Sequence, residues 1–112
     1  MYDVNGTTIA VPRGDSALLS FDLTDEDTGE SYHFGAGEYA VFEVSPVKGA
    51  DAVISKTIIE QTESGAIIVY LTPRDTNITR GDYIYTLRLY SANGEEIDTI
   101  AGFPETAVFE VT

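Results

Sequence analysis

The sequence predicts an all-β protein, an antiparallel β-sandwich of seven to nine strands. Apolar residues recur with a period of two, which places them on one face of a strand. Clusters of turn-forming residues interrupt these runs at spacings of roughly 8–12 residues, as in sandwich domains. No window of ten residues shows the period of an amphipathic helix. The chain has 112 residues, so we expect a single domain over residues 1–112.

The strands are predicted from alternation and from β-branched content. Clear alternation marks residues 17–23, 39–44, 66–71, 83–90 and 107–111. Weaker strands, rich in β-branched residues, are predicted over 7–12, 52–59 and 96–101. Within 39–44, Ala40, Phe42 and Val44 share one face, which we expect to be buried.

Two connections carry specific turn signals. Asn93-Gly94 lies between two strand patterns and predicts a two-residue hairpin loop with a type I′ turn. One short helical turn is predicted near residues 73–79. There Thr72 can cap the turn, Pro73 occupies its first position and Asp75 supplies early negative charge.

The charge balance excludes several partners. Nineteen Asp and Glu against six Lys and Arg give a formal net charge of −13. Six dispersed cations cannot build the basic stripe that a phosphate backbone requires, so we expect neither nucleic acid nor membrane as a partner. No stretch approaches the 18 apolar residues of a membrane span, and residues 1–5 lack the features of a signal peptide.

The sequence holds no recognisable catalytic set. Cysteine is absent, which removes thiol nucleophiles and zinc–thiolate sites. The single histidine, His33, accompanies no nucleophile motif. Arg-Gly-Asp occurs at 13–15 and 80–82, each time directly before a strand, where turn formation explains it better than adhesion. We therefore expect a non-enzymatic protein without a cofactor.

An acidic stretch offers the best metal candidates. Asp22, Asp25, Asp27 and Glu30 place carboxylates around a glycine turn, and calcium prefers hard oxygen ligands of this kind. The stretch lacks the spacing of an EF-hand loop. We favour the alternative interpretation, a polar loop that joins two strands, and predict no metal site.

The tyrosines suggest both a structural and a binding role. Tyr83 follows a helical-turn link as the next strand begins, the position of the tyrosine corner in sandwich domains. Tyr39, Tyr70 and Tyr90 alternate away from the predicted core. They form either a contact surface, since tyrosine is enriched at interfaces, or ordinary cross-strand pairs.

Several segments together carry a resemblance to a known family. They are the turn at 13–15, the acidic turn at 25–29 and the segments 40–44, 65–76, 81–89 and 107–111. In this order they resemble the immunoglobulin-like domain at the start of tailed-phage baseplate upper proteins and related prophage proteins. The resemblance implies an immunoglobulin-like sandwich, protein–protein contacts with other tail subunits or with a second copy, and no catalytic residues.

The expected function follows from that resemblance. It is a structural or docking module of a phage or prophage tail, found in the virion tail or, during assembly, in the bacterial cytoplasm. The alternative is an immunoglobulin-like adhesion or carbohydrate-binding module of a bacterial cell-surface protein, with or without a dependence on calcium.

Overall fold

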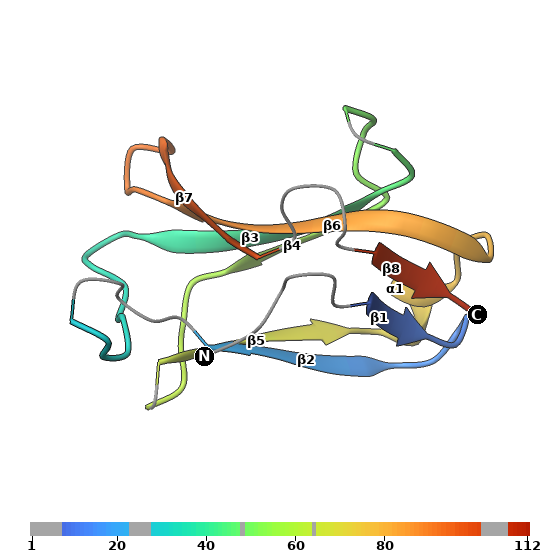
Figure 1. The fold of residues 1–112 in the computed structure, drawn as a ribbon, viewed down its shortest axis with the longest axis horizontal. Coiled ribbons are helices and arrows are strands. Elements are labelled where there is room, and N and C mark those ends of the chain that lie inside the picture. The colour runs from blue at the N-terminus through green and yellow to red at the C-terminus, as the bar shows by residue number, and fades with distance from the viewer. Residues whose placement is uncertain (1–7, 23–27, 48, 64, 102–107) are drawn as a thin grey trace.

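A computed structural model describes residues 8–22, 28–47, 49–63, 65–101 and 108–112, which form two packed β-sheets (Figure 1). These residues contain eight strands and one helical turn. The strands are β1 (Thr8–Val11), β2 (Ala17–Asp22), β3 (Tyr39–Ser45), β4 (Ile54–Ile58), β5 (Ala66–Leu71), β6 (Gly81–Tyr90), β7 (Glu96–Ala101) and β8 (Val108–Val111); the turn is α1 (Pro73–Thr76). Each predicted strand segment overlaps one of these strands, so the prediction of an all-β sandwich is confirmed.

The two sheets differ in size. The large sheet has the order β1-β8-β6-β3-β4, and β7 also pairs with β6. The small sheet contains β2 and β5 alone. Figure 1 shows this pair lying beneath the layer that contains β3, β4 and β6. One pairing departs from the antiparallel expectation, because β1 runs parallel to β8.

Strand β6 organises the large sheet. It pairs with β3 along one edge. Its other edge is shared, with β8 opposite Gly81–Ile84 and β7 opposite Leu87–Tyr90. Neighbours on both edges give a strand hydrogen-bond partners for its backbone groups on both sides.

The core lies between the sheets and draws on both. Phe42 of β3 is fully buried, and its ring centroid lies 6.0 Å from Phe21 of β2, 6.0 Å from Tyr85 of β6 and 6.4 Å from Phe109 of β8. Ala40 and Val44 are buried beside it, as the alternation in this segment predicts. Since Phe21 belongs to the small sheet, this aromatic cluster holds the two layers together.

The β6–β7 hairpin differs from its prediction. The Gly94 N–H donates to Ser91 O over 2.9 Å, and the Ser91 N–H donates to Glu95 O over 2.8 Å. Among the described residues only glycines have positive φ, and Gly94 has a φ of 84°. The two-residue type I′ turn is therefore wrong, because that turn requires positive φ at Asn93 as well. A three-residue loop confines the left-handed conformation to Gly94.

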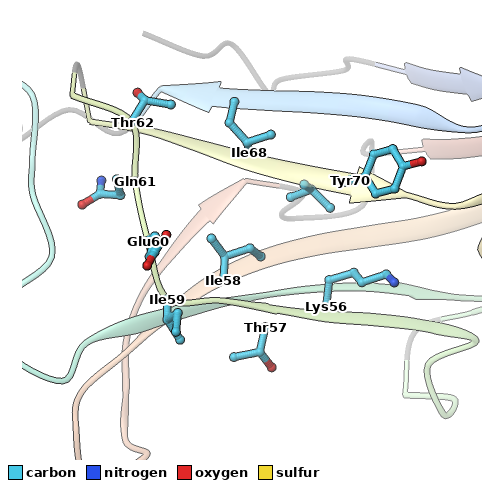
Figure 2. Close-up of a pocket in the computed structure, with 10 residues that line it drawn as sticks. Lys56, Thr57, Ile58, Ile59, Glu60, Gln61, Thr62, Ile68 and Tyr70 are labelled. Carbon is cyan, nitrogen blue, oxygen red and sulfur yellow. The ribbon is translucent and has the colours of Figure 1, made fainter.

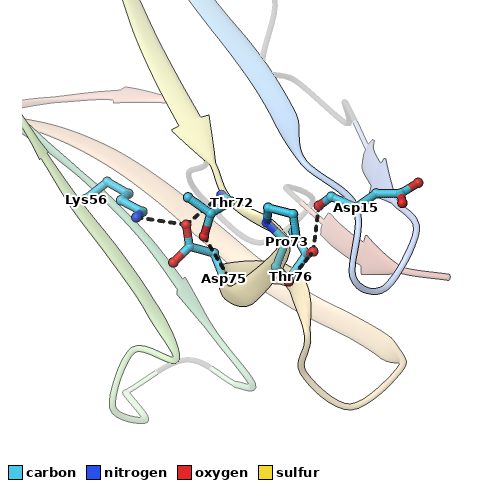
Figure 3. Close-up of polar contacts among 6 residues, drawn as sticks. All are labelled: Asp15, Lys56, Thr72, Pro73, Asp75 and Thr76. Carbon is cyan, nitrogen blue, oxygen red and sulfur yellow. Dashed lines mark hydrogen bonds and ion pairs between the residues drawn. The ribbon is translucent and has the colours of Figure 1, made fainter.

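Helical turn α1 begins as predicted and ends earlier, at Thr76. Thr72 caps it in a capping box: the Asp75 N–H donates to Thr72 Oγ1 over 3.2 Å, and the Thr72 N–H donates to Asp75 Oδ2 over 2.8 Å. The buried Thr76 hydroxyl donates to Asp15 O over 2.6 Å (Figure 3). This bond ties the turn that follows β5 to the residues that precede β2.

Candidate functional site

A groove of about 650 Å³ opens on the surface between β4 and β5. It is lined by Lys56–Thr62 from β4 and the segment after it, and by Ile68–Tyr70 from β5. In Figure 2, Lys56 and Ile58 point from β4 toward β5, whereas Thr57 points away. We call this feature the β4–β5 groove.

The groove exists because none of the strands in the described residues lies beside β5 on that side. After β4, residues 59–63 lead toward the small sheet without forming a strand, and β5 pairs with β2 alone. The sandwich is therefore open along its β4–β5 side. Figure 2 shows this crossing segment closing one end of the groove.

Exposed apolar side chains lie beside the groove. Leu18 and Tyr70 are cross-strand partners on the outer face of the small sheet, and they are 68% and 55% exposed. Ile68 is half-buried on the same face of β5, two residues from Tyr70. Leu18, Ile68 and Tyr70 form what we call the apolar strip. Ile59, on the crossing segment, is 71% exposed.

Gln61 anchors one end of the groove. Its Nε2 donates to Tyr32 O over 3.0 Å and to Gly65 O over 2.8 Å, while its Oε1 accepts from the Phe34 N–H over 2.6 Å. All of these bonds join the crossing segment to neighbouring backbone. Gln61 therefore holds the groove in shape and has little capacity left for a ligand.

The charged groups of the groove differ in availability. Lys56 Nζ lies 2.8 Å from Asp75 Oδ2 (Figure 3), so the cation is already paired. Glu60 is exposed and forms no ion pair within the described residues. The free charge at the groove is thus negative.

Asp75 is held in its charged form. Burial raises the pKa of its carboxyl, but this effect is outweighed by the hydrogen bond from Lys56, by those from the Thr72 backbone and side chain, and by the positive charge of Lys56. The net result is a pKa below the ordinary value of 3.8. The ion pair therefore persists at neutral pH and links β4 to α1 across the second end of the groove.

The three tyrosines of the expected contact surface do not lie together. Tyr39 and Tyr90 are cross-strand partners in the large sheet, with ring centroids 5.4 Å apart and an interplanar angle of 14°. Both are half-buried. They stack on each other as a cross-strand pair, whereas Tyr70 belongs to the small sheet and lines the groove.

Tyr83 and the two Arg-Gly-Asp segments lie at the end of the sandwich near α1. The Tyr83 hydroxyl donates to Thr79 O over 2.5 Å, which is the local hydrogen bond of a tyrosine corner. Arg13 and Arg80 line a second hollow of about 580 Å³, together with Tyr83. Gly14 lies in a turn, with a φ of 81°.

The calcium candidates fall largely outside the described residues. Asp25 and Asp27 are not among the described residues. Asp22 belongs to β2, but its side chain is not described. Glu30 and the lone His33 are exposed. In the part of the chain that the structure describes, no three His, Asp or Glu side chains gather in a way that would hold a metal ion.

Comparison of the chain with protein-family models, with curated protein sequences and with solved structures gives no significant match. Within the described residues, no helix has both the length and the apolar composition needed to cross a bilayer.

Residues Leu18, Ile59, Glu60 and Ile68 of this surface were not predicted from sequence as site residues. One signal was present: Ala66–Leu71 reads Ala-Ile-Ile-Val-Tyr-Leu, which is apolar on both faces of a strand. A strand with one face in water normally alternates with polar residues. The second apolar face therefore indicates a contact surface.

Proposed function

We propose that this protein is a non-enzymatic docking module whose small sheet is covered by a neighbouring protein. The observation that carries the proposal is the apolar strip beside the β4–β5 groove. Single exposed apolar side chains are common, but Leu18 and Tyr70 lie directly opposite each other and adjoin Ile68. Contiguous exposed apolar surface of this kind is typical of interaction sites.

The charge of the chain suits this role. A formal net charge of −13 opposes non-specific association between copies. It also orients and accelerates the approach of a partner with a positive surface. The apolar strip would then supply the binding energy, and the surrounding carboxylates would determine which partner binds.

We further propose an immunoglobulin-like identity and a phage or prophage tail as the setting. The order of the sequence segments favours both, as set out above. Two features of the structure support the first. The tyrosine corner lies at the start of β6, and β2 and β5 form a sheet apart from β3, β6 and β8. In such sandwiches the second and fifth strands face the third, sixth and last strands in this manner.

The absolute mass of the protein tests the docking surface. We would measure light scattering over a tenfold concentration range at two salt levels, for the natural chain and for a Leu18→Ser/Tyr70→Ser double variant. Salt screens repulsion between acidic copies, so weak association should grow with salt and disappear in the double variant. Association that persists unchanged in the double variant would count against the apolar strip as the docking surface.

A second candidate function is carbohydrate binding by a bacterial surface module. The observation that favours it is the exposed Tyr70 ring, which lines the same groove as the carboxylate of Glu60. Small-molecule sites commonly combine aromatic side chains with a few polar groups. Saturable binding of an oligosaccharide that Tyr70→Ala abolishes would favour this function over protein docking.

A further inference from the structure

The free edge of β5 can be assigned residue by residue. The Ala66 N–H donates to Thr62 Oγ1 over 3.0 Å, and Ala66 O accepts from the Thr62 N–H over 2.9 Å, so both groups point away from β2. Backbone groups alternate in direction along an antiparallel strand. The N–H and C=O of Ile68 and Tyr70 therefore also point away from β2, along the groove side of β5.

These four backbone groups form a gap between two satisfied positions. Before them, Ala66 is bonded to Thr62; after them, the Thr72 N–H donates to Asp75 Oδ2. Within the described residues, no hydrogen bond on this edge reaches Ile68 or Tyr70. The gap thus has two donors and two acceptors in the pattern that one further antiparallel strand would satisfy.

The edge lacks the usual protection against strand addition. Edge strands in natural proteins are commonly shortened, bulged or interrupted by lysine or proline. β5 contains neither a charged residue nor a proline, and its pairing with β2 is regular over all six residues. An edge of this kind is a template for another strand.

The charges around the edge select its occupant. A second copy would bring another net charge of −13 and another Glu60 to the same place, which opposes pairing of two β5 edges. A strand with lysine or arginine would meet Glu60, and the exposed Glu63 close to it, with opposite charge. Alternate apolar side chains of that strand would face Ile58 in the groove.

We infer that the β5 edge binds an extended segment of a partner protein in which apolar residues alternate with lysine or arginine, by adding it as a third strand to the small sheet. The inference rests on the proposed docking function and names the site and the chemistry of the partner. Main-chain hydrogen bonds to Ile68 and Tyr70 supply the affinity, and the groove and Glu60 supply the selectivity.

Amide hydrogen exchange tests the edge directly. In the free protein at low concentration, the amides of Ile68 and Tyr70 should exchange fast, while those of Ile67 and Val69, which face β2, should be protected. A short acetylated and amidated peptide of alternating lysine and valine should then protect Ile68 and Tyr70. Protection of both amides in the free, dilute protein would overturn the inference.

A pair of variants separates backbone from side-chain effects. Ile68→Pro removes the outward N–H and leaves the ladder with β2 in place, while Ile68→Ala removes the side chain and keeps the N–H. A thermal melt establishes that both variants fold. We expect Ile68→Pro to bind the lysine–valine peptide about fivefold more weakly than Ile68→Ala, the effect of one hydrogen bond. Equal affinities would contradict edge addition.

The charge requirement has its own controls. Glu60→Gln should weaken binding of the lysine–valine peptide, and a peptide with glutamate in place of lysine should not bind. Equal binding of the two peptides would overturn the choice of a basic partner. Protection of Ile68 and Tyr70 that rises with protein concentration alone would assign the edge to a second copy.

Failure of the inference differs from failure of the proposed function. If Leu18→Ser/Tyr70→Ser abolishes association and Ile68 and Tyr70 stay unprotected in the peptide complex, the outer face docks and the edge does not. If the double variant and the natural chain behave alike while the edge binds the peptide, the apolar strip is not the docking surface.

Discussion

The two sheets place tyrosines in different surroundings. On the large sheet, Tyr39 stacks on Tyr90, and Arg88 lies 3.8 Å from Glu43 and 3.5 Å from Glu96. On the small sheet, Tyr70 faces Leu18 and both stay exposed. Whether a tyrosine ring pairs within the fold or stays exposed depends here on the residue opposite it on the neighbouring strand.

The two sheets also differ in how many neighbours their strands have. Among the strands that the structure describes, β6 has hydrogen-bonded neighbours on both sides, whereas β5 has one. The small sheet is therefore held chiefly by its buried face, through Phe21, and by the bonds around α1. Four predictions test this division, from the largest expected effect to the smallest.

Phe42→Ala removes the ring that joins the two layers. It should lower the free energy of unfolding by about 3–5 kcal/mol, because a fully buried aromatic ring is replaced by a cavity. Urea denaturation followed by circular dichroism measures this change. A loss below about 1 kcal/mol would show that the layers are held elsewhere.

Thr76→Val removes the hydroxyl that links α1 to the residues before β2. It should lower the free energy of unfolding by about 1–3 kcal/mol, since Asp15 O loses its 2.6 Å hydrogen bond in a part-buried place. Thr76→Ser keeps the hydroxyl and serves as the control in the same denaturation experiment. A loss in Thr76→Val that is no larger than the loss in Thr76→Ser would contradict a dominant role of the hydroxyl.

Asp75→Asn removes the charge that pairs with Lys56. Because the folded pKa of Asp75 is depressed, its contribution to stability is present above the ordinary value of 3.8 and is lost as the pH falls through the lower folded value. We expect a deficit of about 1 kcal/mol at neutral pH, since the pair is partly exposed. Denaturation at several pH values should show the deficit constant above about pH 5 and shrinking below pH 3.8. A deficit that is unchanged in acid would exclude the charge as its cause.

Tyr39→Thr and Tyr70→Thr compare the two outer faces with strand propensity preserved. Loss of the stacked ring should cost about 1 kcal/mol at position 39. Loss of the exposed ring should change stability by less than about 0.5 kcal/mol at position 70. Parallel thermal melts of the two variants decide the matter, and equal shifts would remove the distinction between the sheets.

The strands were within reach of sequence reasoning because burial has a period of two. The positions of Phe42, Leu87 and Phe109 in their alternating runs predict their burial, and the structure buries all three. The hairpin at 91–95 was predicted with the wrong turn type, since Asn-Gly suits both a two-residue loop and the end of a three-residue loop. The bond from the Ser91 N–H to Glu95 O, which selects the longer loop, depends on the register of β6 and β7.

The site was harder to predict than the fold. Whether Tyr39, Tyr70 and Tyr90 gather on one surface depends on which strands pair across the sheets, and a single strand pattern does not contain that information. The same holds for the free edge of β5, which exists because the segment after β4 crosses to the small sheet without forming a strand. The lack of a strand in this segment is not marked by any sequence motif.

The parallel pairing of β1 with β8 has a mechanical consequence. Four residue pairs, from Thr8 with Val108 to Val11 with Val111, join a strand near one end of the described chain to a strand near the other. Tension that pulls the start of β1 away from the end of β8 acts on parallel strands in opposite directions. Their hydrogen bonds are then loaded together, in shear, and do not open one at a time. Force applied between β1 and β8 would therefore load all four residue pairs of this short parallel pairing at once.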